Sequence, residues 1–281
     1  MMSITRIFRA GALVLAVSLA GCASHSDSSP RPLVIQRQGS FAVGGVVKTV
    51  PGVYDNDKPT SAGQSFHGDH LYAFYQVPQN PRPLPIVMLH GAFQSARSWE
   101  TTSDGREGFQ NLFLRRGFPV YLVDQPRRGR AGNSTVATTT EPTPYDQLFF
   151  DQFRFGKWPR YFDNVQFDRQ PETLNQFLRS VTPNTGAYDA NVIAEAMAAL
   201  FTKTGPAILF THSQGGGPGW LTAIKSANVK GVVAFEPGSG FIFPPGELPA
   251  AMPSAAGTLA PEAVSAQDFQ ELTRIPIVIY Y

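Results

Sequence analysis

The chain has 281 residues, of which 42% are hydrophobic and 16% charged, and its formal net charge is +2. This composition excludes a disordered chain, and the near-neutral balance argues against a nucleic-acid binder, which needs a basic face. The single Cys excludes a disulfide framework and a multi-cysteine zinc site. The length fits one large α/β domain or two small ones.

Residues 1–21 have the pattern of an export signal. Arg6 and Arg9 precede an apolar run at 10–20, which is too short to span a bilayer but suits the core of a signal peptide. The run ends in LAGC (19–22), which resembles a bacterial lipobox. The resemblance implies cleavage before Cys22, a lipid anchor on its thiol and, because Ala23 follows, sorting to the outer membrane. An ordinary signal peptide with a chance Cys is the alternative.

Residues 22–38 are predicted to form a flexible tether, and one domain is predicted over 39–281. The first strands are expected at 41–50 and 70–77. Continuous apolar runs, which are typical of parallel strands covered on both faces, follow at 86–89, 120–123, 208–210, 232–235 and 277–280. Helical patterns alternate with them at 107–116, 189–203, 216–227 and 267–273. The fold class is therefore α/β, with a mostly parallel sheet and crossover helices.

A segment at about 134–188 interrupts this alternation. It carries nine aromatic residues between Tyr145 and Phe167. Two interpretations stay open. The aromatic side chains form the core of an inserted helical unit, or they belong to a cap and line an apolar substrate pocket.

The sequence ILFTHSQGG (208–216) leads from a buried strand through a small residue and a Ser into glycines and a helix. This is the context of the nucleophile elbow, Gly-x-Ser-x-Gly, although Thr211 stands in place of the first Gly. Ser213 would then be the nucleophile, and the Gln214 N–H, at the helix N-terminus, would stabilise an oxyanion. The alternative is a Ser that only caps the helix.

Together with HGAF (90–93), which follows the strand at 86–89, these residues resemble the α/β-hydrolase superfamily from about residue 40 to the end. The segments 90–109 and 120–132 resemble a branch of bacterial secreted serine esterases that places a Glu acid after strand six. The resemblance implies an α/β-hydrolase fold and hydrolysis of carboxylic esters through an acyl-enzyme, and no cofactor is expected. The aromatic-rich cap insertion suggests apolar or cyclic esters as the substrates. The resemblance also implies Ala92 N–H as the second oxyanion donor and Glu236 as the acid. A Glu236 that only caps Gly238 or Ser239 is the alternative.

The same resemblance implies a catalytic His after the acid, but His25, His67, His70, His90 and His212 all precede Glu236. The chain stops at Tyr281, inside the predicted seventh strand. We therefore expect a truncated domain whose C-terminal end is missing, and a chain that is inactive or a fragment. Rescue of Ser213 by His67, His70 or His90 in a rearranged site is a further possibility. So is a non-catalytic, membrane-anchored lipoprotein that binds an apolar ligand.

The remaining polar groups are given structural interpretations. His90, His212 and Asp124 are expected to support their loops, and Arg127, Arg128 and Arg130 to brace the turn that follows Asp124. Gly215-Gly216-Gly217 lacks the Lys-Ser/Thr of a phosphate-binding loop, and no metal site is expected. The expected partners are a small-molecule ester and a membrane, without nucleic acid and with the oligomeric state left open.

Overall fold

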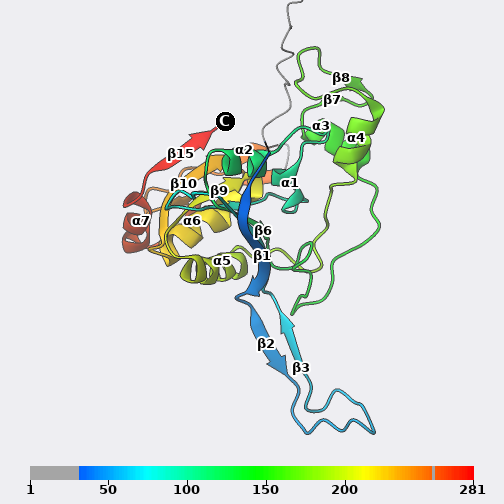
Figure 1. Cartoon of the computed structure of the whole chain (residues 1–281), viewed down its shortest axis with the longest axis vertical. Helices are drawn as coiled ribbons and strands as arrows, with labels where there is room; N and C mark the ends of the chain where they lie inside the picture. Colours follow the sequence, from blue (N-terminus) through cyan, green and yellow to red (C-terminus); the bar gives the residue numbers. More distant parts are fainter. Residues whose placement is uncertain (1–31, 255–256) are drawn as a thin grey trace, which may run out of the picture. The chain divides into compact units, whose positions relative to one another are not determined.

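A seven-stranded sheet forms the centre of the computed structural model, which describes residues 32–254 and 257–281 (Figure 1). Strand β4 is antiparallel to both its neighbours, and all other neighbouring strands pair in parallel. In spatial order the strands are β1 (Ile35–Val43), β4 (Leu71–Pro78), β6 (Val120–Asp124), β5 (Ile86–Leu89), β9 (Ala207–His212), β10 (Val229–Phe235) and β15 (Ile277–Tyr280).

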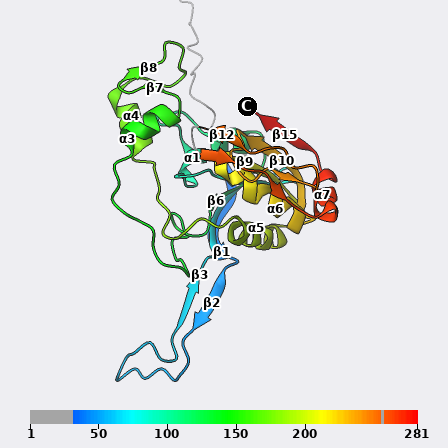
Figure 2. The same ribbon diagram turned by 180° about the vertical axis from the view of Figure 1, so that it is seen from behind.

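Helices cover both faces of this sheet, as the continuous apolar runs predict. Along β5, Val87 and Leu89 pack on one side and Ile86 and Met88 on the other, because successive side chains of a strand point to opposite faces. The first side is covered by α5 (Ala190–Thr204), α6 (Gly216–Lys225) and α7 (Ala266–Thr273). The second is covered by α1 (Arg97–Glu100) and α2 (Phe109–Arg115). Figure 2 shows this layering from behind.

The first part of the domain differs from the prediction. The expected strand at 41–50 is two strands, β1 and β2 (Val46–Thr49), separated by Gly44 and Gly45, whose φ angles of 73° and 79° turn the chain out of the sheet. Because β1 begins at Ile35, the prediction of a tether over 22–38 is wrong for its last four residues. An edge strand keeps polar side chains in solvent, so β1 lacks the apolar pattern by which the other strands are recognised. The predicted signal and Cys22 lie outside the described residues.

Strand β2 pairs with β3 (Ser65–Gly68) in a hairpin that projects from the sheet (Figure 1). Four further short strands precede α7: β11 (Ile242–Phe243), β12 (Met252–Ser254), β13 (Gly257–Leu259) and β14 (Glu262–Ala263). Within 32–254 and 257–281, no helix has the length and apolar character needed to cross a membrane.

The segment 134–188 lies between β6 and α5 and is called the cap below. It contains α3 (Asp146–Gln152), β7 (Gly156–Lys157), β8 (Arg160–Tyr161) and α4 (Pro171–Leu178). Phe150 is buried at its centre and contacts the rings of Phe155, Trp158 and Tyr161 at 4.8–5.8 Å. Part of the predicted aromatic group is therefore the core of this insertion.

Candidate active site

Ser213 lies in a tight turn between β9 and α6. Its φ of 49° is in the left-handed region, where the backbone of any residue other than Gly is strained. The turn is closely packed, because a Cβ on Gly215 would lie 2.6 Å from the carbonyl oxygen of His90 and one on Gly216 2.8 Å from Pro237. The predicted strand–turn–helix context is confirmed. Among the described residues, the Ser213 hydroxyl has no hydrogen-bond partner, and it does not cap the helix.

Thr211 takes the place of the first Gly of the elbow motif without opening the turn. Its side chain is fully buried, and its Cγ2 would lie 2.6 Å from a Cβ built on Gly219, in the second turn of α6. The missing side chain of Gly219 thus makes the room that the extra methyl group of Thr211 needs. This compensation lies eight residues away and restores the close approach of strand and helix.

The loop after β5 packs directly on the elbow. Leu89 pairs with Thr211 in the sheet, and a Cβ on Gly91 would lie 2.9 Å from the Cβ of Ser213. The Ala92 N–H belongs to this loop. The Gln214 N–H lies in the first helical turn, where N–H groups have no partner within the helix. The structure therefore brings together the two segments that carry the predicted oxyanion donors.

Glu236 follows β10 at the same edge of the sheet, since Phe235 pairs with His212. Its side chain is 45% exposed and forms an ion pair with Arg154 of the cap. The Gly238 N–H instead donates to the carbonyl oxygen of Ser213 at 3.0 Å, so Glu236 does not cap Gly238, and a cap on Ser239 stays a prediction. The loop that carries Glu236 is thereby bonded to the elbow.

Two histidines near Ser213, the buried His90 and the half-buried His212, both form hydrogen bonds. His90 Nδ1 donates to the carbonyl oxygen of Gly91 at 2.9 Å, its Nε2 accepts from the Gln125 N–H at 3.3 Å, and burial lowers its pKa to about 4. His212 Nδ1 donates to Gln94 Oε1 at 2.8 Å, and burial lowers its pKa, against the opposing effect of Glu236. Their predicted structural roles are confirmed.

The remaining histidines are His25, His67 and His70. Among the described residues, neither His67 nor His70 forms a hydrogen bond with Ser213, and rescue by one of them stays a prediction. His25 lies outside the described residues.

Gln94 was not singled out from the sequence. Its Oε1 accepts hydrogen bonds from the Gly91 N–H and from His212 Nδ1, both at 2.8 Å. One side chain thus joins the loop after β5 to the residue that precedes Ser213. No local pattern could have indicated this contact, because Gln94 and His212 are 118 positions apart in the chain.

The predicted loop braces are confirmed. Asp124 is 2% exposed and accepts from the Ala96 N–H at 2.7 Å and from Arg130 Nε at 2.8 Å. Arg128 is 1% exposed and donates to the carbonyl oxygen of Gly91 at 2.7 Å. These hydrogen bonds fix the loop after β5, and they occupy the polar groups of Asp124 and Arg128.

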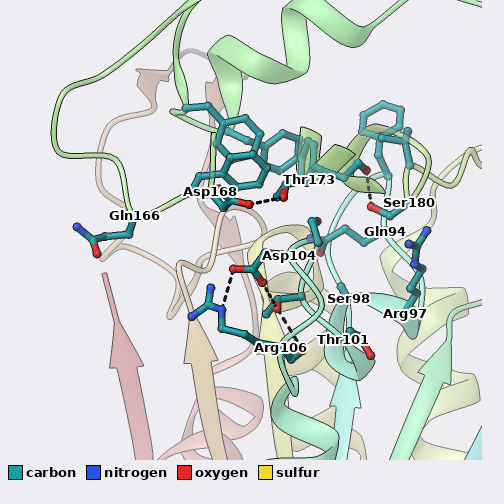
Figure 3. Close-up of a pocket in the computed structure, with 18 of the residues that line it drawn as sticks. Gln94, Arg97, Ser98, Thr101, Asp104, Arg106, Gln166, Asp168, Thr173 and Ser180 are labelled. Carbon is teal, nitrogen blue, oxygen red and sulfur yellow. Dashed lines mark hydrogen bonds and ion pairs between the residues drawn. The ribbon is translucent and has the colours of Figure 1, made fainter. Parts of the chain in front are cut away.

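Two cavities adjoin the site. The first, of about 310 Å³, lies between the cap and the segment 93–106 (Figure 3). The second, of about 510 Å³, is lined by Trp99, Phe109, His212 and Phe235 among others. The residues common to both are Gln94, Ser98, Thr102 and Arg106. Of the predicted cap aromatics, Phe153, Phe155 and Phe167 line the first cavity, and Phe155 also contacts Phe150 in the core of the cap. That this cavity takes a substrate stays a prediction.

The class of protein follows from this fold and elbow together with one further comparison. Residues 86–276 match the alpha/beta hydrolase family, and the chain belongs to that family. It is 32% identical over 240 residues to a probable secreted lipase, phiG, of a fungal species (strain ATCC 74256). That match covers 80% of this chain and 60% of the relative, so the chain spans about 60% of the relative's length.

A solved structure of a bacterial esterase is similar over most of the chain. It superposes with a TM-score of 0.68 at 25% sequence identity, covering 88% of this chain and 75% of the esterase. The predicted α/β-hydrolase fold and the resemblance to esterases are confirmed at this level. Within the described residues, no group of three or more His, Cys, Asp or Glu side chains could hold a metal ion.

Proposed function

We propose that the chain carries the nucleophile, the oxyanion donors and the acid of a carboxylic ester hydrolase, with Ser213 as the nucleophile. The observation that carries the proposal is the strained Ser213, at a strand–helix turn, packed against the loop of Gly91. A backbone held in the left-handed region at such a turn projects the hydroxyl above the sheet, at the positive end of a helix. The lipase and esterase relatives support the same chemistry.

In this mechanism Ser213 Oγ attacks the carbonyl carbon of the ester while its proton passes to a His. The charge that develops on the carbonyl oxygen is stabilised by the N–H groups of Ala92 and Gln214. Loss of the alcohol leaves an acyl-enzyme on Ser213, and water then releases the acid. Glu236 orients this His. The two histidines nearest Ser213 are engaged elsewhere, since both ring nitrogens of His90 have partners and His212 Nδ1 is bonded to Gln94.

Covalent labelling tests the assignment of the nucleophile. The chain and the full product of its gene are treated with a fluorophosphonate probe, and the adduct is located by peptide mass spectrometry. We expect an adduct on Ser213 in the full product and none in its Ser213→Ala variant. An adduct on another residue would overturn Ser213 as the nucleophile. No adduct in any form would favour a non-catalytic lipoprotein that binds an apolar ligand in the cavities.

We further propose that the protein is exported and anchored to the outer membrane through a lipid on Cys22. The LAGC sequence at 19–22 supports the lipid anchor, and the secreted lipase relative supports export alone. Acyl chains contribute about 0.8 kcal/mol per buried methylene, so dual acylation would hold the protein at a membrane. Growth with radiolabelled palmitate should label the wild type and leave Cys22→Ser unlabelled. Equal labelling of both would exclude Cys22 as the anchor.

A further inference from the structure

The cavity of about 310 Å³ between the cap and the segment 93–106 has two unlike walls. The cap side is aromatic, with Phe153, Phe155, Phe167 and Phe177. These rings support one another: Phe155 stacks on Phe167 with centroids 4.1 Å apart, and Phe177 meets Phe153 and Phe155 edge to face at 5.2 and 4.8 Å. A wall of rings already packed together offers flat apolar surface without reordering.

The opposite wall consists of hydroxyl-bearing residues of α1 and the turn after it. Gln94, Ser98, Asp104 and Arg106 lie on this side in Figure 3, facing the ring side chains of the cap. The full set of Ser and Thr residues in this wall is Ser95, Ser98, Thr101, Thr102 and Ser103. The hydroxyl protons of Ser98 and Thr102 are already donated, to the carbonyl oxygen of Ser95 and to the Asp104 carboxylate. Their oxygens can still accept, so this wall suits a substituent that donates a hydrogen bond.

The charged groups of the cavity all have hydrogen-bond partners within the protein. Arg106 Nε donates to Asp104 at 2.7 Å, and this pair lowers the pKa of Asp104, after the larger effect of the hydrogen bond from Thr102. Arg97 donates to Gln176 at 2.9 Å, and Asp168 accepts from the Thr173 hydroxyl at 2.6 Å. Two acids and two arginines balance, so the lining favours a neutral ligand over an anion or a cation.

The size of the cavity limits what it can hold. A dry apolar cavity of roughly 150 Å³ is enough for benzene. About 310 Å³ therefore accommodates one aromatic ring with a short substituent. Gln94 connects this cavity to the elbow. It lines the cavity and accepts hydrogen bonds from Gly91 and His212, which lie beside Ser213.

We propose that this cavity binds the aryl group of a neutral ester and that the preferred aryl group carries a hydroxyl. The ring lies on the phenylalanines of the cap, and its hydroxyl bonds to the wall of Ser98 and Thr102. This inference rests on the proposed ester hydrolase function only in taking the bound molecule to be an ester.

The test measures binding by the full product of the gene with Ser213→Ala, which prevents turnover. Calorimetric titrations use methyl 3-(4-hydroxyphenyl)propanoate, methyl 3-phenylpropanoate and methyl octanoate. We expect the hydroxyaryl ester to bind about tenfold more tightly than the alkyl ester, with the plain aryl ester between them. Since labelling of Ser213 is a separate measurement, binding tests the cavity even if the nucleophile proposal fails.

Variants locate the binding. Added to Ser213→Ala, Phe167→Ala should weaken binding of both aryl esters about fivefold and leave the alkyl ester nearly unchanged. Phe162→Ala is the matched control, because Phe162 is an exposed ring of the same cap that lies outside the cavity lining. Ser98→Ala should remove the advantage of the hydroxyaryl over the aryl ester. Phe153→Leu replaces Phe167→Ala if thermal unfolding shows that the latter disrupts the cap.

Three results would overturn the proposal. They are alkyl binding as tight as aryl binding, equal effects of the Phe167 and Phe162 variants, and no measurable binding of any of the three esters.

Discussion

The elbow around Ser213 and the cap are held together in different ways. Around Ser213, three adjacent strands end in register, and glycines at 91, 215 and 216 bring backbones within distances that a Cβ would not allow. The cap has only short helices and a hairpin of two-residue strands, and ring contacts fill its interior. The groups that we propose to be reactive are thus placed by backbone geometry, which tolerates little change. The proposed binding wall is made of side chains, which can change without moving the sheet.

The largest effect should come from the buried ion pair that ties the base of the cap to the body. Arg127 and Asp69 are 7% and 5% exposed and pair at 2.8 Å, and Arg127 also donates to the carbonyl oxygen of Ala187. Removing one partner leaves a buried charge, so Asp69→Ala should lower the free energy of unfolding by about 3–5 kcal/mol in urea titrations. Asp104→Ala, which breaks a solvent-exposed pair with Arg106, should cost no more than about 1 kcal/mol. Equal losses of unfolding free energy in the two variants would show that the buried pair contributes no more stability than the exposed one.

The elbow side should show its own dependence on pH through His90. Burial lowers the pKa of His90 from 6.5 to about 4, so the unfolded chain takes up a proton at higher pH than the folded protein does. The contribution of neutral His90 to the free energy of unfolding is therefore complete above pH 6.5. It is lost as the pH drops from 6.5 towards 4, and the loss amounts to roughly 3 kcal/mol. Unfolding titrations of wild type and His90→Gln between these limits should show a smaller loss for the variant. Parallel curves would contradict the assignment.

Variants of Gln94 test whether the reactivity of Ser213 depends on this side chain. Gln94→Leu leaves the Gly91 N–H and His212 Nδ1 without their shared acceptor, and fluorophosphonate labelling of the full gene product should slow by about tenfold or more. Gln94→Glu keeps the acceptor oxygen and should restore most of the rate. Gln166→Leu, at an exposed cavity-lining glutamine of the cap, is the matched control. Similar rates for the Gln94 and Gln166 variants would remove the positioning role of Gln94.

The smallest effect should come from the ion pair between the cap and Glu236. Both side chains are substantially exposed, so Arg154→Ala should change the free energy of unfolding by no more than about 1 kcal/mol. Because Arg154 lowers the pKa of His212 and Glu236 raises it, Arg154→Ala should shift this pKa upward and Glu236→Gln downward. NMR titration of the His212 ring measures both, with Arg160→Ala as a control. Shifts of the same sign would contradict this electrostatic picture.

Much of the architecture could be predicted because it depends on local patterns. The strands at 86–89 and 277–280 have the predicted bounds, since a short continuous apolar run is typical of a buried strand. Strand β1 was predicted to begin six residues too late, because its exposed polar positions carry no apolar signal. The division of the cap aromatics between core and cavity could not be predicted either, since it depends on which element each ring faces.

The sequence by itself determined the α/β layering and the strand–turn–helix that holds Ser213, because both follow from the order of residues within about ten positions. The tertiary structure decided three other features: the room that Gly219 leaves for Thr211, the bridge that Gln94 makes to His212, and the two unlike walls of the cavity. Each is a contact between residues brought together by the packing of separate elements. Only the path of the whole chain determines which side chains meet in this way.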